Sequence, residues 1–301
     1  MVKKILKVVG AAAVVIALAF GLFVWVECAR FDASVGKVYD VPVPNVTRST
    51  DPAVIARGKH LVSSIAACAA GHCHGPDLGG GEPIVMGPVG TMTGANLTSA
   101  NLGAAYSDGE FARVIRHGVK KDGRTVLLMP AQDISWLPDS DVVAIVSYLR
   151  VVPGVERENH SSAAKTLGKV LDRNDQIVLD VARRIDHANL PVAPPPEPTA
   201  KYGSFLVRQC TGCHGEHLSG GRIPGTPPSI PATANLTPDA TGLAGWTFDD
   251  FEKLMRTAQR KSGKPLDPFM PVENWKNLDD TEMHALWAFL QTLPASPYGK
   301  R

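Results

Sequence analysis

The sequence predicts a mostly α-helical protein in which two similar modules follow an N-terminal transmembrane helix. Three observations lead to this fold class: an uncharged apolar run near the N-terminus, motifs that recur about 140 residues later, and helical periodicity with little strand-like alternation. The length of 301 residues suits two domains, at roughly 150 residues each. The 31 lysines and arginines nearly balance the 29 aspartates and glutamates. This balance argues against a nucleic-acid partner, because nucleic-acid-binding proteins concentrate basic charge.

Residues 1–28 are predicted to form a membrane anchor. Lys3, Lys4 and Lys7 precede an uncharged run from Val8 to Val26, which is close to the roughly 20 residues that cross the hydrocarbon layer. A cleaved secretory signal has a shorter apolar region and a small-residue cleavage site, so an uncleaved anchor is favoured. The lysines hold the N-terminus in the cytoplasm by the positive-inside rule. We therefore expect a single-pass protein of a bacterial inner membrane, with the bulk of the chain in the periplasm.

The five cysteines are one single residue and two pairs. Cys28 lacks the preceding small residue that lipid modification needs, and we interpret it as incidental. The second pair, Cys210 and Cys213, is followed by His214 in a C-x-x-C-H run, the attachment signature of c-type haem. Two thiols at this spacing add to the two vinyl groups of one porphyrin, and the histidine binds the iron. A redox C-x-x-C would need a βαβ context, and a zinc site would have only His217 nearby.

The first pair departs from this spacing, because Cys68, Cys73 and His74 form a C-x4-C-H run. The vinyl groups are fixed on the porphyrin, so the wider loop must bulge to bring both sulfurs to them. We expect both cysteines to be attached to haem and His74 to bind the iron. Cys73 as the sole attachment, with Ala70 in the place of the first cysteine, and a Cys68–Cys73 disulfide remain open as alternatives. His72 competes with His74, but only His74 directly follows a cysteine.

An internal repeat relates the two motifs and divides the chain. It predicts a first module over residues 52–154 and a second over 199–295, joined by a helical and proline-rich linker over 155–198. The linker is expected to form one or two helices between Ser161 and His187, lying between the modules, over a haem edge or on the surface. The matching segments are His74–Gly81 with His214–Gly221, Ala95–Thr98 with Ala234–Thr237, Met129-Pro130 with Met270-Pro271, and Gly58–Val62 with Gly203–Val207.

Each module is predicted to contain three helices separated by glycine- and proline-rich loops. The first helix leads to the cysteines, the second precedes the Met-Pro loop, and the third closes the module, with an aspartate near its start and a proline beyond its end. The expected ranges are Val54–Ala67, Asp108–His117 and Pro138–Arg150 in the first module, and Lys201–Arg208, Thr247–Thr257 and Asp279–Thr292 in the second.

The repeat also predicts the second axial ligand of each iron. Methionine is a common partner of histidine in c-type cytochromes, where it raises the reduction potential. Only Met129 and Met270 correspond between the two modules and share a following proline. They are therefore the predicted ligands, and the remaining candidates are expected to pack as ordinary apolar residues: Met86, Met92, Met255 and Met283.

These motifs resemble those of tandem class I cytochrome c domains. The sequence is most similar to membrane-anchored di-haem cytochromes c and to the cytochrome subunits of periplasmic alcohol and aldehyde dehydrogenases. The resemblance rests on the run Arg57 to Val62, the two Cys-His motifs, the two Ala-Asn-Leu-Thr motifs and the two Met-Pro motifs. It implies a cytochrome c fold in each module, two covalently bound haem c groups and one-electron transfer between respiratory partners. Those dehydrogenase subunits usually carry three haems, whereas this chain has two motifs.

A histidine and a methionine on each iron would leave no position open for a small-molecule substrate. We therefore expect an electron-transfer protein with redox protein partners, and not an enzyme. The alternatives are a di-haem peroxidase or small-molecule dehydrogenase with one open haem, and a structural or haem-sensing subunit. Basic residues precede each predicted methionine ligand and either steer acidic partners or lie in an ordinary solvated loop, the interpretation we favour: Lys120, Lys121 and Arg124, and Arg256, Arg260, Lys261 and Lys264.

Overall fold

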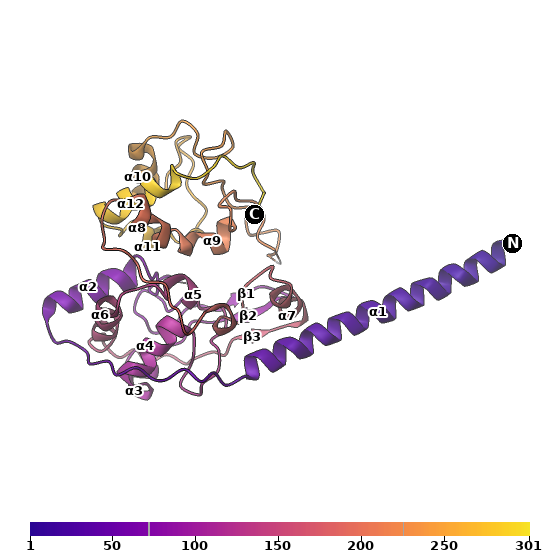
Figure 1. Cartoon of the computed structure of the whole chain (residues 1–301), viewed down its shortest axis with the longest axis horizontal. Helices are drawn as coiled ribbons and strands as arrows, with labels where there is room; N and C mark the ends of the chain where they lie inside the picture. Colours follow the sequence, from indigo (N-terminus) through magenta and orange to yellow (C-terminus); the bar gives the residue numbers. More distant parts are fainter. Residues whose placement is uncertain (72, 225) are drawn as a thin grey trace.

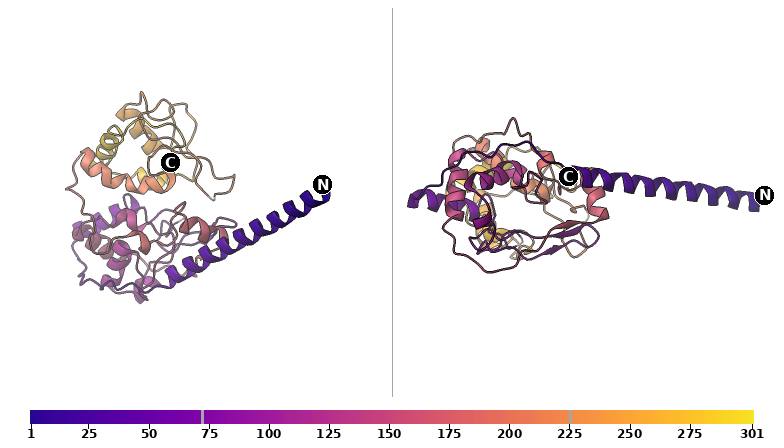
Figure 2. Two further views of the ribbon diagram at one scale, coloured as in Figure 1. Left: turned by 45° about the vertical axis from the view of Figure 1, so that its right-hand side comes forward. Right: turned by 90° about the horizontal axis from the view of Figure 1, so that it is seen from below.

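The computed structural model describes residues 1–71, 73–224 and 226–301, so that His72, one of the candidate ligands, lies outside the described part of the chain. The chain folds into two lobes, and a long N-terminal helix projects from one of them (Figure 1). The lobe next to this helix holds the elements α2 to α7, and the other lobe holds α8 to α12 (Figures 1 and 2). Short helices and long connections dominate both lobes, as the sequence predicts for a mostly helical fold.

The N-terminal helix α1 spans Val2–Gly36 and is longer than the predicted anchor. It is long enough and apolar enough to cross a membrane, by length and composition. Its large apolar side chains are exposed as far as Trp25, whereas Phe31, one turn and a half further on, is only 2% exposed. Phe31 packs with Met92 and Leu179 of the first lobe. The last turns of α1 therefore belong to the folded part of the protein.

The first module is built around a crossing of two helices. Helix α2, Pro52–Ser63, packs on α6, Asp139–Leu149. The contact is so close that a Cβ atom on Gly58 would lie 1.9 Å from the carbonyl oxygen of Ala144. Helix α4, Asp108–His117, has the predicted bounds, and α2 ends four residues before the predicted boundary. Two single-turn helices complete the module: α3, Leu102–Ala105, and α5, Ala131–Ile134.

The second module repeats this crossing with α8, Ala200–Leu206, and α12, Asp280–Leu290. A Cβ atom on Gly203 would lie 2.0 Å from the carbonyl oxygen of Ala285, so glycine is needed at the same point of both crossings. Helix α10, Phe248–Thr257, begins with a capping box, as α4 does. The remaining helices are α9, Arg208–His214, and α11, Val272–Trp275.

The linker does not stand apart from the modules, because it folds onto the first one. It supplies strand β3, Ala163–Ala164, which pairs with β2, Gly90–Met92, and β2 pairs in turn with β1, Ile84–Val85, in an antiparallel sheet. Helix α7, Thr166–Arg173, then packs on α1, and a 3-10 turn, η1, follows at Ala182–Arg184. The linker thus contains the expected helical segments, but the sequence did not predict its strand.

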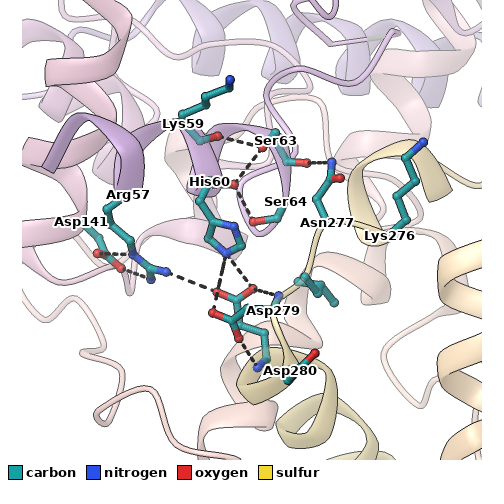
Figure 3. Close-up of polar contacts among 12 residues, drawn as sticks. Arg57, Lys59, His60, Ser63, Ser64, Asp141, Lys276, Asn277, Asp279 and Asp280 are labelled. Carbon is teal, nitrogen blue, oxygen red and sulfur yellow. Dashed lines mark hydrogen bonds and ion pairs between the residues drawn. The ribbon is translucent and has the colours of Figure 1, made fainter. Parts of the chain in front are cut away.

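The two modules meet in a contact that contains a buried carboxylate. Glu282 of α12 is 1% exposed, and both of its carboxylate oxygens lie 2.9 Å from His60 Nε2 of α2. Arg57 donates to Glu282 across the interface at 3.4 Å and to Asp141 of its own module through two hydrogen bonds of 3.1 and 3.0 Å (Figure 3). Arg57 and His60 thus give the buried carboxylate of Glu282 its partners, and this network holds α2 against α12.

Candidate haem-attachment sites

The second predicted motif lies on a helix. Cys210, Cys213 and His214 all belong to α9, which ends at His214. Both cysteines are half-buried free thiols, and burial raises the pKa of Cys210 to about 12. His214 is 6% exposed, and its Nδ1 lies 2.8 Å from the carbonyl oxygen of Ala234. The helix therefore presents two protonated thiols and one oriented imidazole from a single turn and a half of chain.

The first motif reaches a similar arrangement without a helix. The chain leaves α2, passes through Ala67 at φ 47°, and forms a turn in which the His74 amide donates to the carbonyl of Cys68 at 3.0 Å. Cys68 and Cys73 are free thiols, which contradicts the disulfide alternative. Burial raises the pKa of Cys68 to about 12. His74 Nδ1 lies 2.7 Å from the carbonyl oxygen of Ala95.

The paired histidine contacts determine what each imidazole can do. Nδ1 donates its proton to a backbone carbonyl in both modules, which fixes the tautomer and leaves the Nε2 lone pair for a metal. Burial lowers the pKa of both His74 and His214, so both rings are neutral at neutral pH. A neutral imidazole held by a carbonyl is the form that ligates iron.

The accepting carbonyls are held by a motif whose purpose the sequence did not reveal. Ala95 and Ala234 each precede an asparagine, and that asparagine's side-chain oxygen accepts from the amide and the hydroxyl of a threonine two residues later. Asn96 and Asn235 are at most 2% exposed. The recurring Ala-Asn-Leu-Thr sequence was the available signal, and its structural role is to position the carbonyl that orients the histidine.

Met129 and Met270 occupy matching loops. Each precedes a proline that caps a single-turn helix, α5 or α11, and the two prolines have nearly the same backbone angles. Both methionines are half-buried and pack against the main core cluster, as Cys68 and Cys210 do. The competing methionines are used elsewhere. Met255 and Met283 are buried within α10 and α12, as expected of packing residues, and Met86 and Met92 pack in the small cluster around Phe31.

Segments next to the predicted site residues of each module contact the other module. Asp133 of α5 lies beside Arg208 of α9, two residues before Cys210. At the equivalent place in the second module, Asn274 of α11 donates to the carbonyl oxygen of Ser63 at 3.3 Å. Ser63 is in turn the counterpart of Arg208 in the repeat. The loop after each methionine therefore contacts the segment before the other module's cysteines, so the two sites are adjacent across an approximately two-fold interface.

These donor sets fit a covalently bound haem c. Each module offers two unpaired thiols, one neutral histidine with a directed Nδ1 proton, and one half-buried methionine on a loop fixed by proline. Thiols, imidazole and thioether are the groups that attach and ligate haem c. One cysteine and the methionine of each set, Cys68 with Met129 and Cys210 with Met270, pack against one apolar core cluster that spans the two modules, which suits a largely hydrophobic porphyrin.

Comparison with known proteins agrees with this chemistry. The family model for cytochrome c matches residues 200–294, and the model for subunit III of cbb3-type cytochrome c oxidase matches residues 53–149. The cytochrome c subunit of quinone alcohol dehydrogenase from Gluconacetobacter polyoxogenes is 25% identical over 285 residues, which cover 83% of this chain and 58% of the relative. The cytochrome c subunit of gluconate 2-dehydrogenase from Pantoea cypripedii is 35% identical over 96 residues, 30% of this chain and 22% of the relative.

A further relative is the cytochrome subunit of fructose dehydrogenase from Gluconobacter japonicus, 30% identical over 103 residues, which cover 32% of this chain and 21% of the relative. The chain thus spans between 21% and 58% of the length of these three relatives. All three are named as cytochrome subunits of dehydrogenases. The prediction of an electron-transfer protein and not an enzyme agrees with these relatives.

Proposed function

We propose that this chain is a membrane-anchored di-haem electron carrier. The premise is that it contains two cytochrome c domains and is homologous to cytochrome c subunits of dehydrogenases. Helix α1 would hold it in a bacterial inner membrane with both modules in the periplasm. Its partners would be redox proteins: a periplasmic dehydrogenase or a quinol-oxidising complex as the donor, and a terminal acceptor.

In this proposal each module binds one haem c. Cys68 and Cys73 would form the thioethers in the first module, with His74 and Met129 as axial ligands. The corresponding residues of the second module are Cys210, Cys213, His214 and Met270. When bound, haem c supplies reversible one-electron chemistry at its iron.

The residues of the chain orient and protect this group. The carbonyl oxygens of Ala95 and Ala234 keep the Nδ1 protons in place, so that each imidazole presents Nε2 in a fixed direction. The apolar cluster shared by both modules excludes water, which favours a stable potential at each iron. The contact between the post-methionine loops and the pre-cysteine segments supports electron transfer from one module to the other within the chain.

The observation that carries the proposal is the duplicated histidine–carbonyl hydrogen bond, at 2.7 Å in one module and 2.8 Å in the other. Two modules that differ in cysteine spacing and in local backbone still place the same imidazole atom on the same acceptor. Such agreement follows if both histidines have the same role.

Mass spectrometry and visible spectroscopy of the purified full-length chain test the proposal. We expect two covalently attached haems, thioethers at all four cysteines, and an intact anchor. His214→Ala should remove one haem iron's histidine ligand and give a high-spin or haem-deficient second module, whereas the matched control His217→Ala should leave the spectrum unchanged. Fewer than two haems, or equal spectra for both variants, would refute the assignment.

Carbon monoxide separates the carrier from the enzyme alternative. With histidine and methionine on both irons, the reduced protein should not bind carbon monoxide readily, because no coordination position is open. A di-haem peroxidase or dehydrogenase with one open haem would bind it at once and would turn over peroxide or a small substrate. Ready binding by either resting haem would therefore favour the enzyme.

A further inference from the structure

The loop before each predicted methionine ligand is duplicated in conformation. In both modules a hairpin follows the helix α4 or α10, closed by an isolated bridge: Val119 to Thr125 in the first module, and Gln259 to Pro265 in the second. The helix ends in a left-handed residue in both cases, Gly118 at φ 61° and Ala258 at φ 58°. The two hairpins therefore offer a direct comparison of the same structure in two surroundings.

One side of the first module's hairpin is covered by other parts of the chain. The amide of Tyr39, in the segment after α1, donates to the carbonyl of Gly123 at 2.8 Å. From the linker, the amide of Ala182 donates to Thr125 Oγ1 at 2.9 Å. Val119 is completely buried among residues of these two segments. These contacts bury Val119, Gly123 and Thr125, whereas Lys121, Asp122 and Arg124 at the tip stay exposed.

The hairpin of the second module is exposed. Gln259 to Pro265 are all exposed to solvent. A Cβ atom built on Gly263 would meet nothing within 4 Å, whereas one on the equivalent Gly123 would lie 2.7 Å from Val38. Within the described part of the chain, the second hairpin thus lacks the cover that the N-terminal segment and the linker give the first.

The two hairpins also differ in charge. The first has three basic residues, but Asp122 lies at its tip, 3.5 Å from Lys120 and 3.8 Å from Arg124. The equivalent residue in the second hairpin is Ser262, so Arg260, Lys261 and Lys264 have no carboxylate within their own hairpin.

Neighbouring residues extend and limit this charge. Exposed Lys253 of α10 adds a further positive charge and lines a shallow cleft between α10 and the hairpin. Lys261 is paired with Asp250 at 2.6 Å and lies over the ring of Trp246, so its position is fixed. The remaining three cations make no ion pair within the described residues.

We propose that this basic hairpin, Gln259–Pro265 with Lys253, is the docking surface for a redox protein with an acidic surface. The first hairpin has no such role, because it is partly covered and Asp122 offsets its charge. The proposal rests on the electron-carrier function, because the hairpin leads within five residues to Met270. The proposal sets the order of electron transfer: the second module exchanges electrons with the acidic partner, and the first module exchanges them with the second.

Flavodoxin, a small acidic one-electron protein, serves as the probe. The double charge reversal Arg260→Glu with Lys264→Glu is compared with Lys120→Glu with Arg124→Glu at the equivalent positions, in the detergent-solubilised full-length chain. We measure the Kd of oxidised flavodoxin and the rate at which reduced flavodoxin reduces the haems. At low ionic strength the second-module variant should bind flavodoxin about tenfold or more weakly and be reduced about tenfold or more slowly. Steering by opposite charge changes association by roughly 10–1,000-fold. In the first-module variant the Kd and the reduction rate should each change by less than about twofold, because its charges lie away from the proposed docking surface.

Salt and a small reductant complete the test. The difference between the variants should vanish near about 1 M salt, where the Debye length is about 3 Å. Both variants should still take up electrons from dithionite. Equal losses of flavodoxin binding and reduction in the two variants, or no loss in either, would overturn the docking surface. Reduction by dithionite in the same variants would show that the carrier function still stands. Failure of dithionite to reduce the haems reversibly in the unmodified chain would instead overturn the carrier function itself.

Discussion

In the first module the N-terminal segment and the linker cover one side of the methionine-loop hairpin, whereas in the second module the whole hairpin is exposed to solvent. The predicted haem-attachment motifs differ as well, because the first is an irregular turn and the second lies on α9. Yet the histidine–carbonyl hydrogen bond, the asparagine–threonine contacts and the helix crossing are the same in both.

This difference separates two kinds of constraint. Interactions that orient the predicted ligands are local or lie within one module, and both copies retain them. Contacts on the outer side depend on chain that only one copy has beside it, such as β3 and η1 of the linker. The comparison suggests that both modules keep the inner geometry for a shared role, whereas their outer surfaces have diverged.

The largest effect is expected at the two helix crossings. Gly58→Val and Gly203→Val should each prevent their own module from folding, because even the Cβ atom would lie 1.9 or 2.0 Å from a backbone oxygen. The haem content of the purified chain should fall from two to one in each variant. Gly36→Ala is the control, since a Cβ atom there meets nothing within 4 Å. Retention of both haems in either valine variant would show that the crossing tolerates separation of the helices.

Removal of the proposed methionine ligands is expected to have the next largest effect. Met129→Ala and Met270→Ala should each open one iron, allow carbon monoxide to bind it, and lower one of two reduction potentials by on the order of 0.1–0.2 V, within the roughly 0.8 V that axial ligands span. Potentiometric titration measures the change. Met255→Leu and Met283→Leu, at buried core positions, should leave both potentials in place. A fall in potential in one of these controls would show that the ligand was assigned to the wrong methionine.

The sequence was sufficient to predict the parts of the fold that local patterns specify. The helices α4, α6, α10 and α12 have bounds within two residues of those expected, because apolar periodicity and capping residues such as Ser107 and Thr247 act over a few positions. The paired motifs followed from the repeat, since two copies of one pattern distinguish the corresponding methionines from the other five.

The parts that the sequence did not reveal depend on contacts between distant segments. Neither the addition of Ala163–Ala164 to a sheet nor the docking of Phe31 beside Leu179 leaves a periodic pattern, because each involves one or two residues. The buried position of Glu282 had a partial signal in the sequence Asp279-x-x-Glu282, which forms a capping box. Its second role, as the acceptor for His60 and Arg57 of the other module, follows only from the packing of α2 on α12.

The buried carboxylate between the modules provides a third test. Glu282 and Asp141 occupy equivalent positions in α12 and α6, and Arg57 donates to both. Glu282→Gln should lower the free energy of unfolding by about 1–3 kcal/mol, because it leaves charged or polar groups of the other module without their buried partner. Asp141→Asn should cost less, since the Asp141 side chain is 15% exposed against 1% for Glu282. Urea unfolding measures both, and an equal or larger loss for Asp141→Asn would contradict a special role for the contact between modules.

A pH-dependent effect is expected at a position where the repeat has diverged by one charge. Asp133 in the first module corresponds to Asn274 in the second, and the amides of both donate to a proline carbonyl at 3.0 Å. Burial raises the pKa of Asp133 to about 7, against the opposing influence of Arg208 and a hydrogen bond from Gln132. Because the pKa of Asp133 is higher in the folded than in the unfolded chain, its protonated carboxyl group contributes to the stability of the fold. This contribution is complete below about pH 4 and is lost as the pH rises through about 7.

Asp133→Asn should therefore make the first module behave like the second, whose asparagine does not titrate. The variant should gain stability relative to the unmodified chain as the pH increases between about 4 and 7, by up to about 1.4 kcal/mol per pH unit. Urea unfolding across this range measures the difference, and exposed Asp249→Asn serves as the control. A stability difference that does not change with pH would show that Asp133 is ionised throughout and is paired with Arg208. In that case the interface would be a salt bridge on one side and a neutral hydrogen bond on the other, and the two modules would differ in charge where they meet as well as on their outer surfaces.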